Sequence, residues 1–448
     1  DVVMRFATLD LVRNQWRRYQ ADLKERNTGC ATLQSPDDFL DVNSVGVQET
    51  SGYILPPGIV REQALGVNPN ALQNERSLSM TVCDLANSDA QGIYKLVNMD
   101  MRQFKRMKMF VHGESALCGA GNTLEDGDLR VFVRLGSDFS KNYYEYELPV
   151  SFTPDELLED VSLRNTSEYP RIVWPAINDL NIDFDNLVKM KRLRNKDGAP
   201  IDQRYSIEES LNENNIDIEL RENERYSIVG NPNLGEVKSI LIGVRNPCDD
   251  GDVKGAEIWV NELRVFGLDE EGGAAATARL DLQMADFATV TLAGLATTDG
   301  WGQIDERVNE RQRESIVTYD VAAQVELDKF LPEQWGLKVP FLFQHSKELS
   351  TPEYDPYDKD VLLKDKASDQ ETQEEKDLVN EQAKSVRTTT SYNFTNVRKE
   401  RTNKDKAPMP WDVSNFSLTY NNEQTELQDP YYESDKLERQ RGAIDYSY

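Results

Sequence analysis

The sequence predicts an all-β protein with two parts, a β-sandwich and a following set of longer antiparallel strands, together with a few helices. Residues 40–268 contain many short runs in which apolar and polar residues alternate, and clusters of Gly, Asn and Asp separate these runs. Beyond Gly273 the alternating runs become longer. Nowhere does the chain contain about 18 consecutive apolar residues, so the sequence predicts no transmembrane helix.

The first predicted element is an amphipathic helix over residues 8–26, within a segment at 1–36 that otherwise serves as a linker. Thr8 is suited to the N-cap, and Asn27 and Gly29 supply stop signals. The apolar face is defined by residues spaced three or four apart, namely Leu9, Val12, Trp16, Tyr19 and Leu23. The opposite face is basic. This pattern predicts a helix that docks on a neighbouring domain, and a helix on a membrane surface is the alternative.

Residues 37–270 are predicted to form the β-sandwich. One helix interrupts it near Phe184 and Lys191 and ends at Gly198. The run at 256–266 resembles the last strand of jelly-roll sandwiches of the carbohydrate-binding type. The apolar rows are Leu78, Met80 and Val82; Leu129, Val131, Val133 and Leu135; Tyr144, Tyr146, Leu148 and Val150; and Ile240, Ile242 and Val244. Arg130, Arg134, Glu145 and Glu147 alternate with these rows on the opposite faces of their strands.

Residues 269–273 mark the boundary between the two parts, because a charged stretch is followed there by two glycines. In the second part, residues 271–448, the clearest strand covers residues 315–327. Ala285, Asp286 and Phe287 predict a turn between two strands. Further apolar rows are Leu280, Leu282 and Met284; Leu337, Val339, Phe341 and Phe343; and Phe416, Leu418 and Tyr420. A polar, acidic stretch at 358–385 predicts a solvated loop that contains a helix.

The long strands of the second part are compatible with two architectures. The run at 315–327 exceeds the 5–6 residues typical of soluble strands, and it is long enough to cross a membrane at a tilt. Aromatic residues gather near the strand ends, as in the belts at membrane–water boundaries: Phe330, Trp335, Tyr354, Tyr357, Trp411, Tyr431 and Tyr432. Periodicity alone does not separate the wall of a membrane β-barrel from a second soluble sandwich with aromatic residues at its rim.

The composition is that of an acidic protein with enough apolar residues for a sizeable core. The chain has 448 residues, of which 38% are hydrophobic, and its formal net charge is -28. Length alone predicts about three domains. Nucleic-acid binding requires Lys and Arg to replace the counterions of phosphates, so we expect no nucleic-acid partner. The short basic run at residues 398–406 is interpreted as a solvated loop.

No pattern of residues predicts an active site. His112 and His345 each lie in a strand-like run and are interpreted as strand-end residues rather than as bases. The stretch at 113–117 lacks the last Gly of a nucleophile elbow, and that at 119–124 lacks the last Gly of a dinucleotide fingerprint. Acidic loops at 125–128 and 249–252 offer oxygen ligands for calcium without EF-hand spacing, so we interpret them as solvated turns. The sequence thus predicts no catalytic, cofactor-binding or metal-binding residue, and hence no enzyme.

Four cysteines, Cys30, Cys83, Cys118 and Cys248, match no spacing of zinc ligands. In an oxidising compartment they would form two disulfides, with three possible pairings, and free buried thiols are the alternative. The chain begins at Asp1 without a signal peptide. Residues 444–448 alternate like the start of a strand. We therefore expect this chain to be an excerpt of a longer protein.

Several short motifs are spread over most of the chain. They are VRNQWRRY at 12–19, AEIWVNELR at 256–264, GGAAATAR at 272–279, ADF at 285–287, KFLP at 329–332 with WG at 335–336, TPEYDP at 351–356 and VRKER at 397–401. In this order they resemble the SprA/Sov family, the outer-membrane translocon of the type IX secretion system of Bacteroidetes. The motifs together are more specific than any one of them.

The resemblance implies a location in the outer membrane and a very large single-chain β-barrel through which folded cargo proteins are exported. The complete fold prediction is then a jelly-roll-like β-sandwich followed by long antiparallel strands that form part of a large outer-membrane β-barrel. The implied partners are membrane lipid, a barrel protein at a lateral gate, a periplasmic plug protein and cargo with a C-terminal signal. In gliding species the family also serves motility. No catalytic residues carry over from it.

The alternative function is that of a cell-surface carbohydrate-binding β-sandwich protein. Its motivation is the run at 256–266 together with Tyr143 and Tyr144, which the sequence suggests are exposed. A hydrolase is a third hypothesis, which requires a pair of acids about 5–10 Å apart in a cleft.

Overall fold

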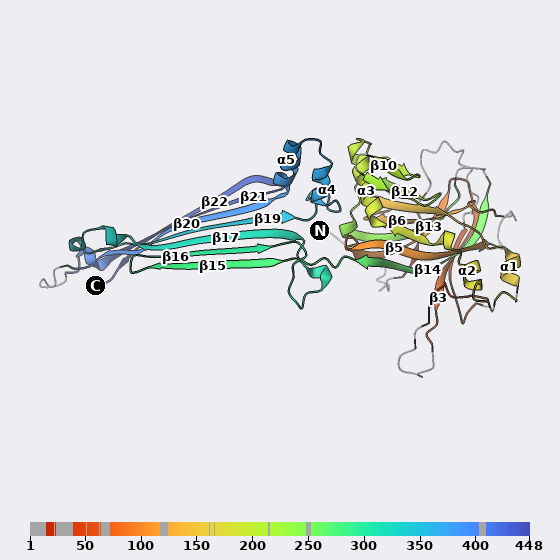
Figure 1. The fold of residues 1–448 in the computed structure, drawn as a ribbon, viewed down its shortest axis with the longest axis horizontal. Helices are drawn as coiled ribbons and strands as arrows, with labels where there is room; N and C mark the ends of the chain where they lie inside the picture. Colours follow the sequence, from red (N-terminus) through yellow and green to blue (C-terminus); the bar gives the residue numbers. More distant parts are fainter. Residues whose placement is uncertain are drawn as a thin grey trace, which may run out of the picture. The chain divides into compact units, whose positions relative to one another are not determined.

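The computed structural model describes residues 15–21, 23, 39–50, 52–61, 63, 72–116, 124–160, 162–164, 166–213, 216–247, 252–402 and 409–448. The chain consists of two compact units, Asp1–Asp269 (unit 1) and Glu270–Tyr448 (unit 2) (Figure 1). Most of the regular structure is β, in antiparallel sheets, so the all-β prediction is confirmed. Among the described residues, no helix combines the length and the apolar character needed to cross a bilayer.

Unit 1 is a β-sandwich of a seven-stranded and a five-stranded sheet, with a separate two-stranded hairpin. In spatial order, the larger sheet consists of β1 (Arg17–Arg18), β4 (Ala90–Met99), β13 (Val237–Arg245), β6 (Arg130–Gly136), β7 (Tyr143–Pro149), β12 (Arg225–Val229) and β9 (Tyr205–Ile207). The smaller sheet consists of β2 (Phe39–Gly46), β3 (Arg76–Leu85), β14 (Lys254–Leu268), β5 (Phe104–Ser115) and β8 (Leu180–Asp183). The hairpin consists of β10 (Leu211–Glu213) and β11 (Ile216–Ile218).

One apolar core lies between the two sheets of unit 1. Alternating residues such as Val131 and Val133 of β6 and Ile258 and Val260 of β14 meet there. The predicted helix near Phe184 is α3 (Phe184–Lys196), which adds its apolar side chains to the same core. Gly198 follows it with φ +64°, a conformation that glycine adopts without strain.

Further layers cover the outer faces of both sheets. The short helices α1 (Asp155–Glu159) and α2 (Tyr169–Val173) precede Trp174, which packs with Trp259 of β14 on the outer face of the smaller sheet. On the outer face of the larger sheet, apolar residues of three strands pack with residues of the N-terminal segment and a loop: Ala90, Phe132, Leu241, Leu23 and Phe139.

The helix predicted over residues 8–26 is wrong where the structure describes that stretch. Residues 15–21 contain no helix, and Arg17–Arg18 form strand β1, which pairs with the edge strand β4. The Tyr19 amide donates to the carbonyl of Gly92, and the Tyr19 ring packs 5.3 Å from that of Phe139. Satisfying the free backbone groups of β4 outweighs helix propensity here. The rest of the predicted helix and most of the segment at 1–36 lie outside the described residues.

Unit 2 contains an open, eight-stranded antiparallel sheet. In spatial order its strands are β15 (Ala275–Met284), β16 (Ala288–Thr297), β17 (Glu314–Glu326), β19 (Pro340–Pro352), β20 (Ser385–Lys399), β21 (Phe416–Asp429) and β22 (Tyr432–Tyr446), and β18 (Leu337–Lys338) pairs with β20. The predicted turn at Asp286 joins β15 to β16. Residues 444–448 contain the end of β22, not the start of a strand, because β22 folds back along β21.

The polar stretch at 358–385 contains two helices, α4 (Leu363–Ser368) and α5 (Gln373–Ala383). Thr372 and Glu375 form a capping box that starts α5. Short 3-10 turns occur at Ala176–Asn178, Leu234–Glu236, Val308–Glu310, Leu327–Phe330, Glu333–Trp335 and Val413–Asn415.

Cys83 on β3 is disulfide-bonded, so free thiols at all four cysteines are ruled out. Cys30, Cys118 and Cys248 lie outside the described residues.

Candidate functional site

A group of charged side chains lies on the outer face of the seven-stranded sheet. Its members, named here the buried charge cluster, are Glu145, Glu147, Arg130, Arg134, Arg204, Arg225 and Arg245. The sheet register brings them together, because Arg134 stands opposite Glu145 and Glu147 stands opposite Arg225 on adjacent strands. Five guanidinium groups thus surround two carboxylates.

Arg245 connects the two carboxylates of the buried charge cluster. Its Nη1 lies 3.0 Å from Glu145 Oε1 and also contacts Glu147 Oε2. Arg134 Nε lies 2.5 Å from Glu145 Oε2, and Arg225 Nη2 lies 2.8 Å from each oxygen of Glu147. The side chains of Glu145, Glu147 and Arg245 are 0% exposed. The four strands β13, β6, β7 and β12 are therefore joined by a network of charges in which both carboxylates are shielded from water.

Both carboxylates stay ionised within this network. Burial by itself raises the pKa of the Glu145 carboxyl, but the charges of Arg204, Arg245 and Arg134 outweigh it and hold that pKa well below its usual range. Burial likewise raises the pKa of Glu147, and the charges of Arg245 and Arg225 lower it further than burial raises it. A permanently ionised, ion-paired carboxylate is a poor general acid.

We expect unit 1 to lose stability in acid because of these two carboxylates. Their pKa values are lower in the folded than in the unfolded chain, so the folded state binds fewer protons. The stabilisation is complete above the ordinary glutamate value of 4.5 and is lost as the pH falls through the folded values. The free energy of unfolding, measured against pH from 7 to 3, is expected to fall below that value. In Glu147→Gln the fall should be shallower, and an unchanged slope would contradict this assignment.

His112 belongs to the core of unit 1. It lies inside β5 rather than at a strand end, and its ring is fully buried 4.4 Å from that of Trp259. Its Nδ1 lies 2.6 Å from the carbonyl oxygen of Val173, and Nε2 lies 3.3 Å from Glu114. With both ring nitrogens occupied and no access to solvent, His112 is placed as a packing residue.

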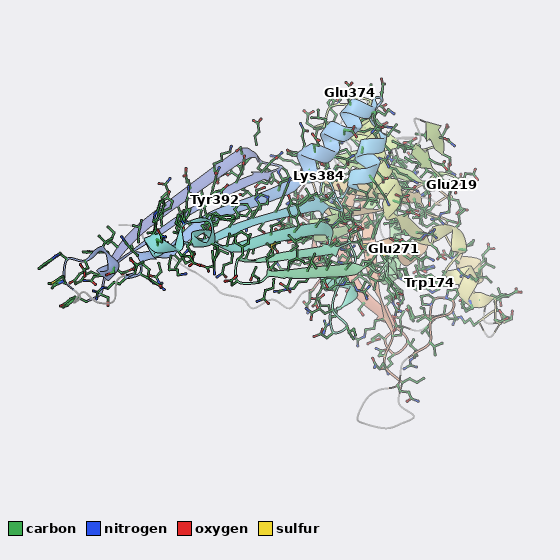
Figure 2. The ribbon with its side chains drawn as sticks, turned by 60° about the vertical axis from the view of Figure 1, so that its left-hand side comes forward. Trp174, Glu219, Glu271, Glu374, Lys384 and Tyr392 are labelled. Carbon is green, nitrogen blue, oxygen red and sulfur yellow. The ribbon has the colours of Figure 1, made fainter. Side chains whose placement is uncertain are left out.

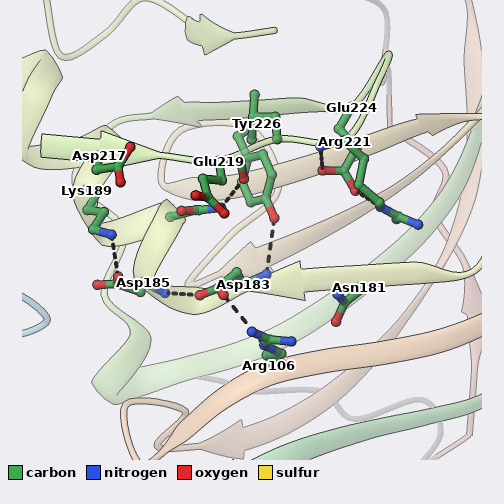
Figure 3. A pocket seen from close by; sticks show the side chains of 12 residues that line it. Arg106, Asn181, Asp183, Asp185, Lys189, Asp217, Glu219, Arg221, Glu224 and Tyr226 are labelled. Atoms are coloured by element: carbon green, nitrogen blue, oxygen red, sulfur yellow. Dashed lines mark hydrogen bonds and ion pairs between the residues drawn. The ribbon is translucent and has the colours of Figure 1, made fainter. Parts of the chain in front are cut away.

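A polar hollow of about 350 Å³ opens beside β8 and α3 in unit 1 (Figure 3). Lys189 Nζ lies 2.7 Å from Asp185, and Arg106 Nε lies 3.6 Å from Asp183. The hydroxyl of Tyr226 accepts a hydrogen bond from the Asp183 amide at 3.1 Å. Small-molecule sites are mostly apolar with a few polar groups, whereas charged pairs line this hollow. We interpret it as a solvated groove.

The other residues that the sequence singles out do not assemble into a site. His345 lies in β19, with its Nδ1 3.0 Å from the Thr390 hydroxyl. In the loop at 125–128, Asp128 accepts a hydrogen bond from the Glu125 amide at 2.8 Å, and it also lies 2.8 Å from the ammonium of Lys254. Of the loop at 249–252, only Asp252 is described. No group of three or more His, Cys, Asp or Glu side chains within the described ranges is arranged to hold a metal ion.

The tyrosines that motivate a carbohydrate-binding surface are not exposed. Tyr144 is 1% exposed and belongs to the core between the sheets. Tyr143 is 7% exposed, and the guanidinium of Arg134 lies 4.3 Å from the centre of its ring. Neither ring offers the accessible flat surface for a sugar that the sequence suggests.

On β15, β16 and β17, the sheet of unit 2 has one apolar face and one mainly polar face. On the apolar face, Leu292 of β16 stands between Leu280 of β15 and Val321 of β17. Cross-strand partners share a face and alternate along each strand. The apolar face therefore also carries Ala276, Ala278, Leu282, Met284, Val290, Gly294, Ala296, Val317, Tyr319, Ala323 and Val325. The mainly polar face carries Thr277, Arg279, Asp281, Gln283, Thr289, Thr291, Thr318, Asp320 and Gln324, together with Ala293, Leu295 and Ala322.

No layer of the described structure buries this apolar face. Leu280, Met284 and Val317 are 49, 48 and 47% exposed. The three clusters of buried apolar side chains found in the described residues all belong to unit 1. Figure 2 shows Tyr392 of β20 among side chains that stand on both faces of the sheet. A wide apolar surface of this kind marks a site of contact with another phase or molecule.

Exposed aromatic residues stand at both ends of the strands of unit 2. At the end where β15 finishes, named the Met284 end, they are Phe330, Trp335 and Trp411. At the opposite end, named the Ala275 end, they are Tyr357, Tyr431 and Tyr432. The apolar rows lie between these two groups.

A comparison with known protein families identifies the family of the chain. A family model described as motility related/secretion protein, SprA_N, matches residues 1–367, which include all of unit 1 and the first strands of unit 2. A search of curated proteins finds no match. The match covers most of the chain, and it confirms the resemblance found in the sequence. The chain belongs to the SprA_N family of motility-related secretion proteins.

Proposed function

We propose that unit 2 is a portion of the wall of an outer-membrane protein-conducting channel, which exports folded cargo proteins in type IX secretion and gliding motility. The observation that carries the proposal is the apolar face of β15, β16 and β17, which is continuous across three strands in register and is left uncovered. In this proposal acyl chains of the outer membrane contact the apolar face, and the polar face lines a water-filled lumen.

The dimensions of the apolar face are those of a membrane strand. On β17 it extends from Val317 to Val325, which is roughly 26 Å of strand at about 3.3 Å per residue. Tilted by about 40°, this length spans roughly 20 Å of membrane thickness, close to the apolar band of about 25 Å in outer-membrane barrels. The aromatic residues at the Met284 end, Phe330, Trp335 and Trp411, take the position of an interfacial girdle.

In water the same sheet would be prone to aggregation. β15 and β22 form two open edges with unpaired backbone groups, next to an apolar surface, and such sheets aggregate. In the proposed wall, further strands of the barrel would pair with both edges, because eight strands do not enclose a cargo-sized pore. The lateral-gate barrel protein, the periplasmic plug protein and cargo with a C-terminal signal are the partners that this function implies.

Fractionation of the full-length protein tests the proposal. We expect the protein to sediment with the outer membrane, to resist extraction by high salt and alkaline carbonate, and to require detergent for solubilisation. Recovery of the full-length protein as a detergent-free soluble monomer would exclude the proposed function. A periplasmic protein and an established outer-membrane barrel from the same cells serve as controls.

A further inference from the structure

The register of the eight-stranded sheet relates the depths of residues on different strands. One row of cross-strand partners runs through Leu280, Leu292, Val321, His345, Thr390, Gln424 and Glu438. All these side chains lie on the same face. The row is apolar on β15, β16 and β17, and it is polar on β21 and β22.

On this face of the last two strands, away from the turn, the apolar residues lie nearer to the Met284 end. On β21 they are Phe416, Leu418 and Tyr420. On β22 they are Ile444 and Tyr446, which pair with Leu418 and Phe416. From β15 to β22 the apolar stretch therefore moves along the strand direction. The same row cannot mark one depth in a bilayer on all strands.

The size of this displacement gives an angle. Ile444 lies six positions from Glu438, which is roughly 20 Å along β22. Six interstrand spacings of about 4.8 Å separate β15 from β22, which is roughly 29 Å. The apolar band thus crosses the rows at about 35°, within the range of strand tilt in membrane barrels, about 35–45°.

The polar part of the β21–β22 hairpin carries charges on both of its faces. Glu426 lies 3.1 Å from Lys436 on the face that carries Leu418, and Glu423 lies 3.6 Å from Arg439 on the opposite face. These four side chains are 39–58% exposed. A charge on the lipid face is strongly unfavourable near the bilayer midplane, so this segment requires water on both of its faces.

We infer that the lipid boundary crosses the sheet obliquely, and that residues 422–440, at the tip of the β21–β22 hairpin, stand outside the bilayer. This inference rests on the proposed function of unit 2 as a membrane wall. The loop after β19 contacts this hairpin tip. The hydroxyl of Tyr357 donates a hydrogen bond to the carbonyl of Pro430, and the Tyr357 ring packs 6.2 Å from that of Tyr431. The insertion between β19 and β20, which contains α4 and α5, therefore contacts a part of the sheet that lies in water, not a part that lies in the bilayer.

Single cysteines in the full-length protein test the inference. Leu292→Cys and Gln424→Cys lie in one row of the sheet, and Leu418→Cys lies in the proposed band on the same strand as Gln424. Isolated outer-membrane fragments, open on both sides, are treated with a membrane-impermeant maleimide, and labelling of the unsubstituted protein is subtracted as background. Thr291→Cys on the polar face reports the labelling of an accessible position.

We expect Gln424→Cys to be labelled to the same extent as Thr291→Cys. We expect Leu292→Cys and Leu418→Cys to remain unlabelled. Protection of Gln424→Cys, or labelling of Leu418→Cys, overturns the oblique boundary. If Leu292→Cys is protected in the same experiment, the proposed function as a membrane wall is not contradicted. Labelling of Leu292→Cys together with Leu418→Cys overturns the proposed function itself. The amount of each variant in the outer-membrane fraction shows that its barrel has assembled.

Discussion

Arg245→Met is expected to lower the free energy of unfolding of unit 1 by about 3–5 kcal/mol, the usual loss when one partner of a buried ion pair is removed. Arg245 touches both Glu145 and Glu147, and none of these side chains is exposed. Without it, two like charges on adjacent positions of one face remain buried with fewer partners. Methionine matches the length of the arginine stem and keeps contact with the Phe132 ring, so the loss reports the charge rather than a cavity.

Replacement of an exposed basic residue of the same strand by methionine provides the control. Lys238 of β13 is exposed, and its Nζ lies 3.4 Å from Glu236. Because exposed ion pairs contribute about 0–1 kcal/mol, Lys238→Met should change the stability very little. Urea unfolding followed by near-ultraviolet circular dichroism measures both variants. Equal effects of the two substitutions would show that the buried charge cluster contributes nothing specific.

A second substitution is expected to recover part of the loss. Combining Arg245→Met with Glu147→Gln removes one of the two carboxylates that Arg245 leaves behind. The loss of unfolding free energy in the double variant should then be smaller than the sum of the losses in the two single variants, because both residues belong to one network. Additive effects would contradict the assignment of Arg245 and Glu147 to a shared cluster.

The sequence shows the alternation of the strands but not what covers each face. Val317 to Val325 on β17 alternate as predicted, and the structure confirms a strand at Glu314–Glu326. Glu145 and Glu147 alternate with Tyr144 and Tyr146 in the same manner, which is typical of a half-buried strand. Their burial depends on Arg204, Arg225 and Arg245, which are 59 to 100 positions away in the chain.

A local signal for part of the buried charge cluster was nevertheless present. The segment between β6 and β7 is short, so the two strands form a hairpin, and hairpin pairing places Arg134 opposite Glu145. Like Arg130, Arg134 lies on the polar side of β6. Two arginines facing two glutamates across a hairpin predict ion pairs. The sequence does not show that a further layer excludes water from them.

The extended conformation near Trp16 could not be predicted from spacing. Residues three and four apart satisfy the helical pattern, yet Tyr19 and Leu23 pack against residues of the larger sheet as an added edge segment. The decisive partner, β4, begins about 70 positions further along the chain. Periodicity describes which residues are buried, whereas the element type was fixed here by the free backbone groups of that distant edge.

In the proposed membrane wall, Leu292→Arg on the apolar face of unit 2 is expected to destabilise the inserted protein by about 2–4 kcal/mol, whereas Thr291→Arg on the polar face should cost far less. The two positions are neighbours on β16 and differ in the face they present. Thr291 stands opposite Asp281, so an arginine there gains an opposite charge. Heat-modifiable migration of the full-length protein and its amount in the outer membrane measure both variants.

The position of the charge along β16 distinguishes lipid from a protein core. In a bilayer the cost peaks at Leu292 and falls to about 0–1 kcal/mol at Ala288 and Ala296, near the strand ends. A packed protein interior would instead penalise each position according to its own packing, and Ala288, 7% exposed, would be the worst. In water Leu292→Arg would cost almost nothing, since the side chain is already 38% exposed. A profile centred on Leu292 therefore requires acyl chains against this face.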